Sequence, residues 1–211
     1  DALTLGTGAV SLDTGSTAGG VTISSTIDGA VDLDISSGTG AVAIQGVVGG
    51  TTALATLDVN ATDGSGTIEV TDIGDGNPSA GVTGLTRLGN INTGTLTLDG
   101  SNYDFGGGFT LGSGTYTLSG STGAFTSTGD VSFLGNVVVD GTFSVDSGGG
   151  DITIAGNITG TNGDEIVTLT DGTAGDGTGT ITIGGYIGNT TGNTSNIKSV
   201  TLTGDTGISL G

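Results

Sequence analysis

The sequence contains no cysteine, histidine, methionine or tryptophan, and it has one proline among its 211 residues. Without cysteine, the chain can form no disulfide framework and can perform no thiol chemistry. A single proline beside 47 glycines excludes a collagen-like triple helix, which needs proline throughout its repeat. Because the chain starts at Asp1 and lacks methionine, we expect a processed product or an excised piece of a longer protein.

Basic residues are nearly missing as well. Arg87 and Lys198 stand against 21 acidic residues, which gives a formal net charge of -19. Nucleic acids need a basic surface that neutralises their phosphates, so this composition excludes them as partners. An anionic bilayer surface is disfavoured for the same reason, and no apolar run of about 18 residues is present for membrane insertion. Cations are the small partners that this charge favours.

Glycine is abundant, but the chain does not have the composition of a flexible linker. Its mean hydropathy is +0.22, and valine, isoleucine and leucine recur at every second position. Disordered segments lack such apolar patterning. Glycine, threonine, valine, serine and aspartate are all weak helix formers, so we expect an all-β chain.

Short alternating runs at 95–98, 115–118, 136–139 and 151–154 predict half-buried strands that are separated by turns. Leu98 precedes Leu118 by 20 residues, and Leu118 precedes Val139 by 21. A repeat of this length is typical of stacked solenoids. We therefore predict one right-handed parallel β-helix over residues 1–211, with about ten coils of about 20 residues and a length of about 50 Å.

The alternative fold is a tandem array of immunoglobulin-like β-sandwich domains. Such domains have longer strands and a core with more aromatic side chains, including the tryptophan that is absent here. The short runs therefore favour the β-helix.

Three segments, at 40–49, 150–158 and 179–188, fit one template. Each has apolar residues at x, x+2 and x+6, with a glycine two residues after the second. The template predicts a strand, a glycine corner and a second strand on the next face, as in a stacked repeat. Residues 74–84, which include Pro78, and residues 171–179 break the pattern. We expect both stretches to be loops that leave the wall of the β-helix.

Two longer segments carry a resemblance to a known class of proteins. GVVGGTTALATLDVNATDGSGTIEV, at 46–70, and GDITIAGNITGTNGDEIVTLTDG, at 150–172, resemble repeat regions of large bacterial surface adhesins. The text is similar to that of filamentous haemagglutinin and of autotransporter passenger regions. The resemblance covers most of the chain and implies a secreted parallel β-helix at the bacterial cell surface. It contains no diagnostic motif and identifies no functional residue.

Aspartate–glycine turns offer oxygen ligands for calcium, which binds carboxylates and turn carbonyls. The candidate ligands fall in two turn-rich regions: Asp63, Asp72 and Asp75 in one, and Asp164, Asp171 and Asp176 in the other. The same residues suit plain turns, because aspartate and glycine readily adopt left-handed backbone conformations. The nearest match to the calcium-binding β-roll repeat, at 148–152, has its aspartate two positions too early. No other cofactor is expected.

No catalytic constellation is visible in the sequence. Histidine and cysteine are absent, and Glu69 and Glu165 are the only glutamates. β-Helical lyases and hydrolases need paired carboxylates, or calcium with a basic residue, in a groove. Arg87 is the single basic candidate, and it falls in a predicted loop region where a solvated role is commoner. We therefore expect no enzymatic activity.

An outward threonine ladder that binds a glycan or ice is a further hypothesis. Its members are four Thr-x-Thr pairs: Thr95/Thr97, Thr115/Thr117, Thr180/Thr182 and Thr201/Thr203. The first two pairs are 20 residues apart and the last two are 21 apart, which is about one predicted coil. Threonine is also frequent in strands for its β propensity alone.

Aromatic residues are few and clustered. Seven of the eight lie between residues 103 and 143. This clustering predicts an internal stack of rings rather than a platform for carbohydrate.

The strand pattern continues almost to both ends of the chain, and neither end has a capping repeat. Leu3 and Leu5 begin the pattern, and Ile208 and Leu210 end it. Uncapped solenoid ends expose apolar core and unpaired backbone groups. We therefore expect strand pairing at these residues, either with flanking repeats of a longer chain or with other copies in an end-to-end polymer. The function expected is that of a structural or adhesive extracellular segment, and the alternative is a solenoid that binds a glycan, ice or calcium.

Overall fold

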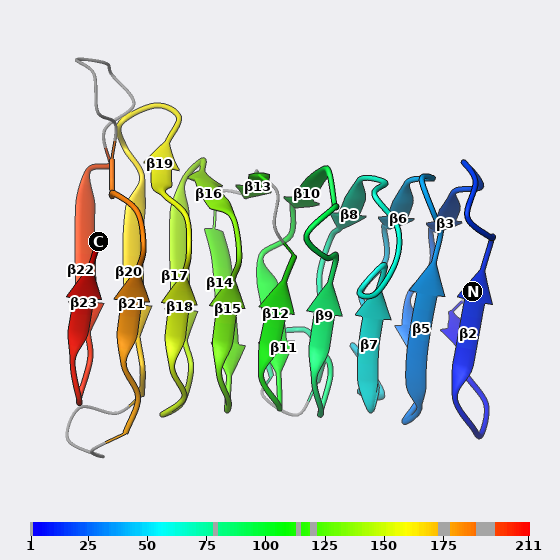
Figure 1. Ribbon diagram of the computed structural model, residues 1–211. Helices are drawn as coiled ribbons and strands as arrows, with labels where there is room; N and C mark the ends of the chain where they lie inside the picture. Colours follow the sequence, from blue (N-terminus) through cyan, green and yellow to red (C-terminus); the bar gives the residue numbers. More distant parts are fainter. Residues whose placement is uncertain (1, 78–79, 113–114, 119–121, 173–177, 189–196) are drawn as a thin grey trace.

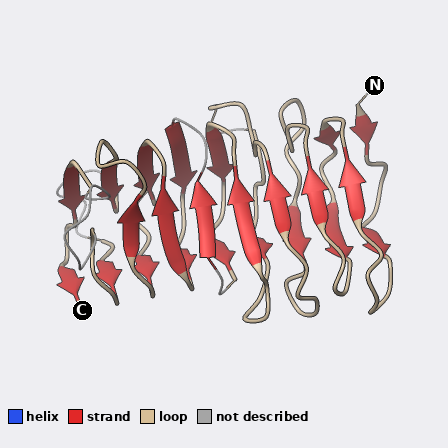
Figure 2. Ribbon diagram, turned by 90° about the horizontal axis from the view of Figure 1, so that it is seen from above, coloured by secondary structure: helices blue, strands red, loops and turns tan. Residues whose placement is uncertain are grey.

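The computed structural model describes residues 2–77, 80–112, 115–118, 122–172, 178–188 and 197–211. This part of the chain contains 23 short strands and no helix. Successive strands fall in turn on three sheets, which we call faces A, B and C. The chain is therefore a three-sided β-solenoid, and its coils follow one another from the N-terminal to the C-terminal end in both views (Figures 1 and 2).

Each face is a column of strands, one from each successive coil. Face B contains nine strands: β2 (Val10–Asp13), β5 (Asp32–Ser36), β7 (Thr56–Val59), β9 (Thr86–Leu88), β12 (Phe109–Leu111), β15 (Val131–Phe133), β18 (Ile152–Ile154), β21 (Ile181–Ile183) and β23 (Ile208–Leu210). Face C contains seven: β3 (Val21–Ile23), β6 (Val42–Ile44), β8 (Ile68–Val70), β10 (Thr95–Leu98), β13 (Thr115–Leu118), β16 (Asn136–Val139) and β19 (Ile158–Gly160). Face A contains β1 (Leu3–Thr4), β4 (Ile27–Asp28), β11 (Asn102–Phe105), β14 (Thr122–Ser127), β17 (Thr142–Asp146), β20 (Ile166–Thr170) and β22 (Ser199–Thr203). Single bridges at Val48 and Ile73 link β4 to β11.

The number of coils differs from the sequence prediction. The nine strands of face B enclose about eight turns, so ten coils of about 20 residues is wrong. Val131 lies beside Ile152, 21 residues later, but Ile152 lies beside Ile181, 29 residues later. The extra residues of the longer coil lie mainly in its corners, at 161–165 compared with 140–141 and at 171–180 compared with 147–151. At about 4.8 Å per strand, face B extends about 40 Å rather than 50 Å.

Every strand pair in the described chain is parallel. Examples are β2 with β5 at the N-terminal end and β21 with β23 at the C-terminal end. β-Sandwiches of the immunoglobulin type are antiparallel, so the alternative fold is not adopted. An all-β parallel solenoid is confirmed.

Side chains alternate between a shared interior and the solvent, as the period of two predicts. In β10, Leu96 and Leu98 are buried while Thr95 is exposed. Register places each inward residue on its counterpart in the next coil, so Ile152 stacks on Ile181 and Ile154 on Ile183. Full burial of such a side chain stabilises the fold by about 1.5–3 kcal/mol before the entropy of ordering is counted. The interior is one continuous apolar column.

The predicted internal stack of aromatic rings is confirmed. The rings of Tyr103 and Phe125 lie 4.6 Å apart and nearly parallel, and those of Phe109 and Phe133 meet edge to face at 5.4 Å. All seven aromatic residues between 103 and 143 are buried, whereas Tyr186 is 40% exposed. Large rings therefore fill the middle of the rod, and aliphatic side chains fill both ends.

The predicted unit of strand, glycine corner and strand is complete at 150–158, where β18 and β19 flank Gly156, whereas in the other two template segments the second strand is reduced to a single bridge at Val48 or Ile187. A Cβ atom at the corner glycines Gly46, Gly156 or Gly185 would overlap the backbone of the preceding coil, which explains the glycines. The segments are not equivalent in the coil, however. The first begins on face C with β6, and the other two begin on face B with β18 and β21.

The irregular stretch predicted at 74–84 is shorter than expected, because the chain is back in the wall of the solenoid by Val82. Ile73 bridges Val48 and Tyr103, and Val82 bridges Leu54 and Phe105, so both residues lie in the wall. Between them, Gly74 and Gly76 have positive φ angles of 80° and 84°, which favour glycine. Residues 173–177 of the second predicted loop lie outside the described residues.

Thr86 is a polar residue in the apolar column. It lies in register between Leu57 and Phe109, is fully buried, and its Oγ1 has no hydrogen-bond partner among the described residues. An unsatisfied buried hydroxyl lowers stability. We predict that Thr86→Val raises the free energy of unfolding by about 1 kcal/mol. Chemical denaturation measures this change. Thr110→Val, on the outward side of the next strand, is the control and should give no gain.

Candidate functional site

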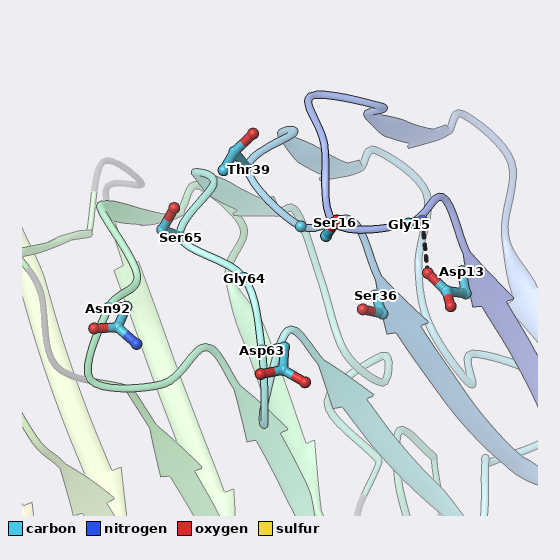
Figure 3. A pocket seen from close by; sticks show the side chains of 10 residues that line it. Asp13, Gly15, Ser16, Ser36, Thr39, Asp63, Gly64, Ser65 and Asn92 are labelled. Carbon is cyan, nitrogen blue, oxygen red and sulfur yellow. Dashed lines mark hydrogen bonds between the residues drawn. The ribbon is translucent and has the colours of Figure 1, made fainter.

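The loops that join face B to face C are longest in the first coils. They span residues 14–20, 37–41, 60–67 and 89–94, compared with 134–135 and 155–157 further along. The second of the four is shorter than the loops before and after it, and residues of all four loops or of their flanking strands line one groove. The resulting groove has a volume of about 720 Å³ and is shown in Figure 3. We call it the corner groove.

Small and polar residues line the corner groove. Besides three glycines, the lining consists of Asp13, Ser16, Ser36, Thr39, Asp63, Ser65 and Asn92. A second cavity of about 220 Å³ shares Asp13, Ser36 and Asp63 with it and adds Ser11 and Asp34 on face B. The groove therefore continues from the corner loops onto the outward side of face B.

Hydrogen bonds hold the loops of the corner groove in shape. Asp13 Oδ1 accepts the Gly15 N–H at 2.7 Å, which closes a tight turn. Asn60, whose φ is 47°, accepts the Ser37 N–H at 2.8 Å through its buried side chain. Asn90 Nδ2 donates to the carbonyl oxygens of Asn60 and Gly64 at 2.6 Å and 2.9 Å. The bonds of Asn60 and Asn90 join consecutive coils, so the groove walls are built into the solenoid.

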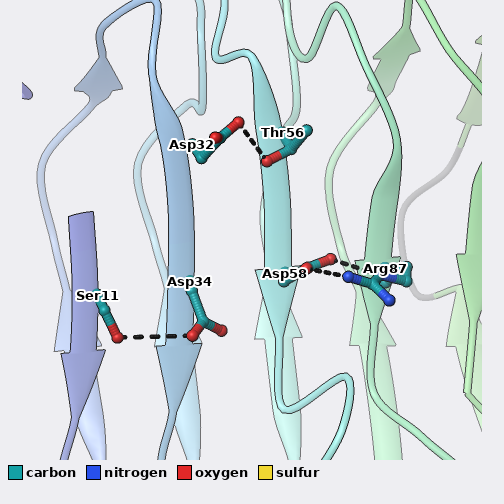
Figure 4. Close-up of polar contacts among 6 residues, drawn as sticks. All are labelled: Ser11, Asp32, Asp34, Thr56, Asp58 and Arg87. Atoms are coloured by element: carbon teal, nitrogen blue, oxygen red, sulfur yellow. Dashed lines mark hydrogen bonds and ion pairs between the residues drawn. The ribbon is translucent and has the colours of Figure 1, made fainter. Parts of the chain in front are cut away.

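Acidic side chains stand next to one another on face B beside the groove (Figure 4). Asp34 and Asp58 are register partners, and like charges directly opposite each other are destabilising. Arg87 Nε donates to Asp58 Oδ1 at 2.7 Å, and Arg87 Nη2 forms an ion pair with Asp58 Oδ2. The hydrogen bond to Asp58 raises the pKa of Arg87. Burial acts to lower this pKa, and the negative charges of Asp58 and Asp34 raise it further. The single basic candidate for catalysis is thus committed to a structural ion pair.

Corner carboxylates and amides accept backbone N–H groups from the following coil. Asp72 Oδ1 accepts the N–H groups of Ser101 and Asn102 at 2.7 Å and 2.9 Å. The same arrangement recurs at other corners: Asp28 with Thr51 and Thr52, Asp130 with Asp151, Asp151 with Thr180, Asn136 with Asn157, and Asn157 with Tyr186. These side chains satisfy donors that the strand ladder leaves unpaired.

The structure separates five of the six candidate calcium ligands by role. Asp63 lines the corner groove, Asp72 holds the next coil, and Asp75 closes its own turn by accepting the Asn77 N–H at 3.0 Å. Asp171 is buried and accepts the Asp205 N–H at 2.8 Å, whereas Asp164 is exposed.

Asp176 lies outside the described residues. No three acidic residues within the described ranges are arranged to hold a metal ion. Calcium binding therefore stays a prediction with no site assigned.

Two buried carboxylates have perturbed pKa values that the sequence did not indicate. Burial raises the pKa of Asp104, and although the Gly76 N–H at 2.8 Å opposes this shift, the charges of Asp75 and Asp72 add to it. Burial also acts to raise the pKa of Glu165. Hydrogen bonds from the backbone N–H groups of residues 161–163 and of Glu165 itself outweigh burial and lower this pKa to about 2. Asp104 anchors the 74–84 loop, and Glu165 caps the 161–165 turn.

The threonine pairs are only partly aligned. Thr95 and Thr97 of β10 are in register with Thr115 and Thr117 of β13 on face C. Thr182 lies on face B and Thr201 on face A, so their pairs are not one coil apart. The longest outward column of hydroxyls was missed: Thr110, Ser132, Thr153, Thr182 and Ser209 on face B. Unequal coil lengths conceal it in the sequence.

Comparison of the chain with protein-family models, with curated proteins and with solved structures finds no match. Within the described ranges there is also no helix of the length and hydropathy needed to cross a bilayer.

The corner role of Asp72 can be tested by substitution. Asp72→Ala removes the acceptor of two N–H groups, and we predict a loss of about 1–2 kcal/mol in the free energy of unfolding. Asp72→Asn keeps a carbonyl oxygen and should lose clearly less. Denaturation at equal ionic strength measures both variants. Equal losses for alanine and asparagine would mean that the negative charge matters, rather than the acceptor.

Glu165 and Asp104 should affect the pH dependence of stability in opposite directions. The lowered pKa of Glu165 means that its stabilising contribution is present above its ordinary value of 4.5 and is lost as the pH falls toward about 2. Glu165→Gln should therefore lower the melting temperature at pH 7, and the difference should shrink over that acidic range.

The raised pKa of Asp104 means that its ionised form destabilises the fold, so its effect on stability grows as the pH rises. Asp104→Asn keeps an acceptor for Gly76 and should gain stability relative to the native chain as the pH rises. Melting curves between pH 2 and pH 7 test both.

Proposed function

We propose that this chain is a non-enzymatic structural segment of an extracellular bacterial filament or large surface adhesin. One observation carries the proposal: the sheets run through the rod and end in open edges. In the described chain, β2 and β3 pair on one side only, and so do β22 and β23. Unpaired edge strands are templates for further strand pairing.

The apolar interior is also open at both ends. Leu5, Val10 and Leu12 of the first coil are only partly buried, although they point into the column. At the other end, Ile208 is 45% exposed and Leu210 is 60% exposed. An additional coil on either end would bury these side chains and continue the ladder, whether it came from flanking repeats or from another copy.

A second copy would add to the rod without closing it. Because the strands of each face all run in the same direction, the last coil of one copy can pair in parallel with the first coil of the next. A head-to-tail contact of this kind generates a fibre rather than a closed oligomer. The parallel crossovers imply a right-handed coil, since such connections are almost always right-handed.

The composition supports the extracellular location in this proposal, and the ion pair of Arg87 supports a non-enzymatic role. The acidic, cysteine-free chain fits a bacterial surface protein, and Arg87 is held by Asp58. A net charge of -19 excludes nucleic acid as a partner and opposes assembly at low ionic strength. Salt or divalent cations should therefore promote association.

End-to-end assembly can be tested with charges placed at the ends. Leu5→Lys or Ile208→Lys should prevent association in high salt, because lysine cannot enter the apolar column between two copies. Leu134→Lys is the matched control: Leu134 is 40% exposed but lies on a corner in the middle of the rod. Sedimentation velocity at increasing salt measures the assembly state.

The expected result is association of the native chain and the Leu134→Lys variant, with both end variants monomeric. A native chain that stays monomeric at high concentration and salt would contradict assembly between copies. Equal association of the end variants would contradict the predicted contact residues.

A further inference from the structure

The corner groove is not needed to explain a structural rod. It opens on the side of the molecule and draws on four successive coils. Its first loop belongs to the first coil, but neither Leu5 nor Ile208, the residues tested for end-to-end contact, lines it. Its walls are fixed by hydrogen bonds between coils, including those of Asn60 and Asn90. A volume of about 720 Å³ lies in the usual range of small-molecule sites, about 300–1,000 Å³.

The lining favours a ligand covered with hydroxyl groups. No aliphatic or aromatic side chain larger than alanine lines the corner groove. Ser36, Thr39 and Ser65 offer hydroxyls, and Asn92 offers an amide, so each can both donate and accept. An apolar ligand would gain little burial here, whereas a sugar ring carries matching donors and acceptors around its edge.

The charges in the groove select among sugars. Asp13 and Asp63 lie in the corner groove, and Asp34 lies in its extension onto face B. Arg87, on face B, is paired with Asp58, and Lys198 lies just before β22 in the last coil. Carboxylates accept strongly from ammonium groups, and a net charge of -19 repels anionic sugars.

We propose that the corner groove binds a cationic saccharide, a short oligomer of unacetylated amino sugars. Its ammonium groups contact Asp13 and Asp63, and its ring hydroxyls contact Ser36, Thr39 and Ser65. A polyamine fits less well, because its methylene groups would displace water from the polar walls without replacing the hydrogen bonds that the wall groups make to that water. A calcium ion would leave most of the groove empty, and no three acidic residues in the described part of the chain are arranged around one point.

Isothermal titration calorimetry with the full chain tests this proposal, using the glucosamine tetramer as the probe. The fully acetylated tetramer has the same sugar backbone without the charges, and spermine has the charges without the sugar. We expect the glucosamine tetramer to bind, and both comparison compounds to bind at least about tenfold more weakly. Repeating the titration with the Ile208→Lys variant should give the same affinity, which separates binding from assembly.

Matched variants locate the site. Asp13→Asn with Asp63→Asn should weaken binding by about tenfold, because asparagine keeps the turn at Gly15 but removes the charge. Asp146→Asn with Asp164→Asn is the control: it changes the net charge equally, and Asp146 makes the same turn with Gly148. Thr39→Trp keeps the charge and should weaken binding by filling the groove.

Several results would overturn the proposal. No heat from the glucosamine tetramer at millimolar concentration would do so. Equal losses in the two paired asparagine variants would reduce the effect to net charge alone. Spermine or calcium binding as tightly as the sugar, or displacing it completely, would mean that the groove recognises cations without a saccharide.

Discussion

The coil-to-coil backbone ladder is the constraint on which the rest of this molecule depends. Parallel, in-register pairing places every strand residue about 4.8 Å from its counterpart in the next coil. Inward positions must therefore be apolar along the whole column, as in the stack of Ile152, Ile181 and Ile208. Thr86 departs from this rule and leaves its hydroxyl without a described partner. The ladder tolerates no insertion within a strand, so all variation in coil length falls in the corners.

At the corners the backbone leaves the ladder, and its N–H groups need other acceptors. Asp28, Asp72 and Asp130 supply carboxylate oxygens to the coil that follows, and asparagines do the same at neighbouring corners. This role explains four of the 21 acidic residues, Asp151 being the fourth. Like charges directly opposite each other repel, and where Asp34 and Asp58 are register partners, Arg87 forms an ion pair with Asp58.

Function in such a rod has two kinds of place available to it. The ends offer open strand edges and apolar side chains, which suit continuation by similar coils. The corner loops are free of the ladder, so they can differ in length and enclose space, as those of the first four coils do around the corner groove. The strands between them act as a rigid support that fixes the spacing of the loops.

The sequence by itself determined the all-β class, the parallel solenoid, the internal position of the aromatic rings and the glycine corners. Alternation and turn chemistry act over a few residues, so Leu96 and Leu98 are recognisable as inward residues without knowledge of the fold. Only the tertiary structure decided the number of coils, the separation of Thr182 and Thr201 onto different faces, and the grouping of Asp13 with Asp63 in one groove. The physical reason is that a corner loop can gain several residues without altering the local pattern of either flanking strand. Each such gain shifts the register of all later residues relative to a fixed repeat.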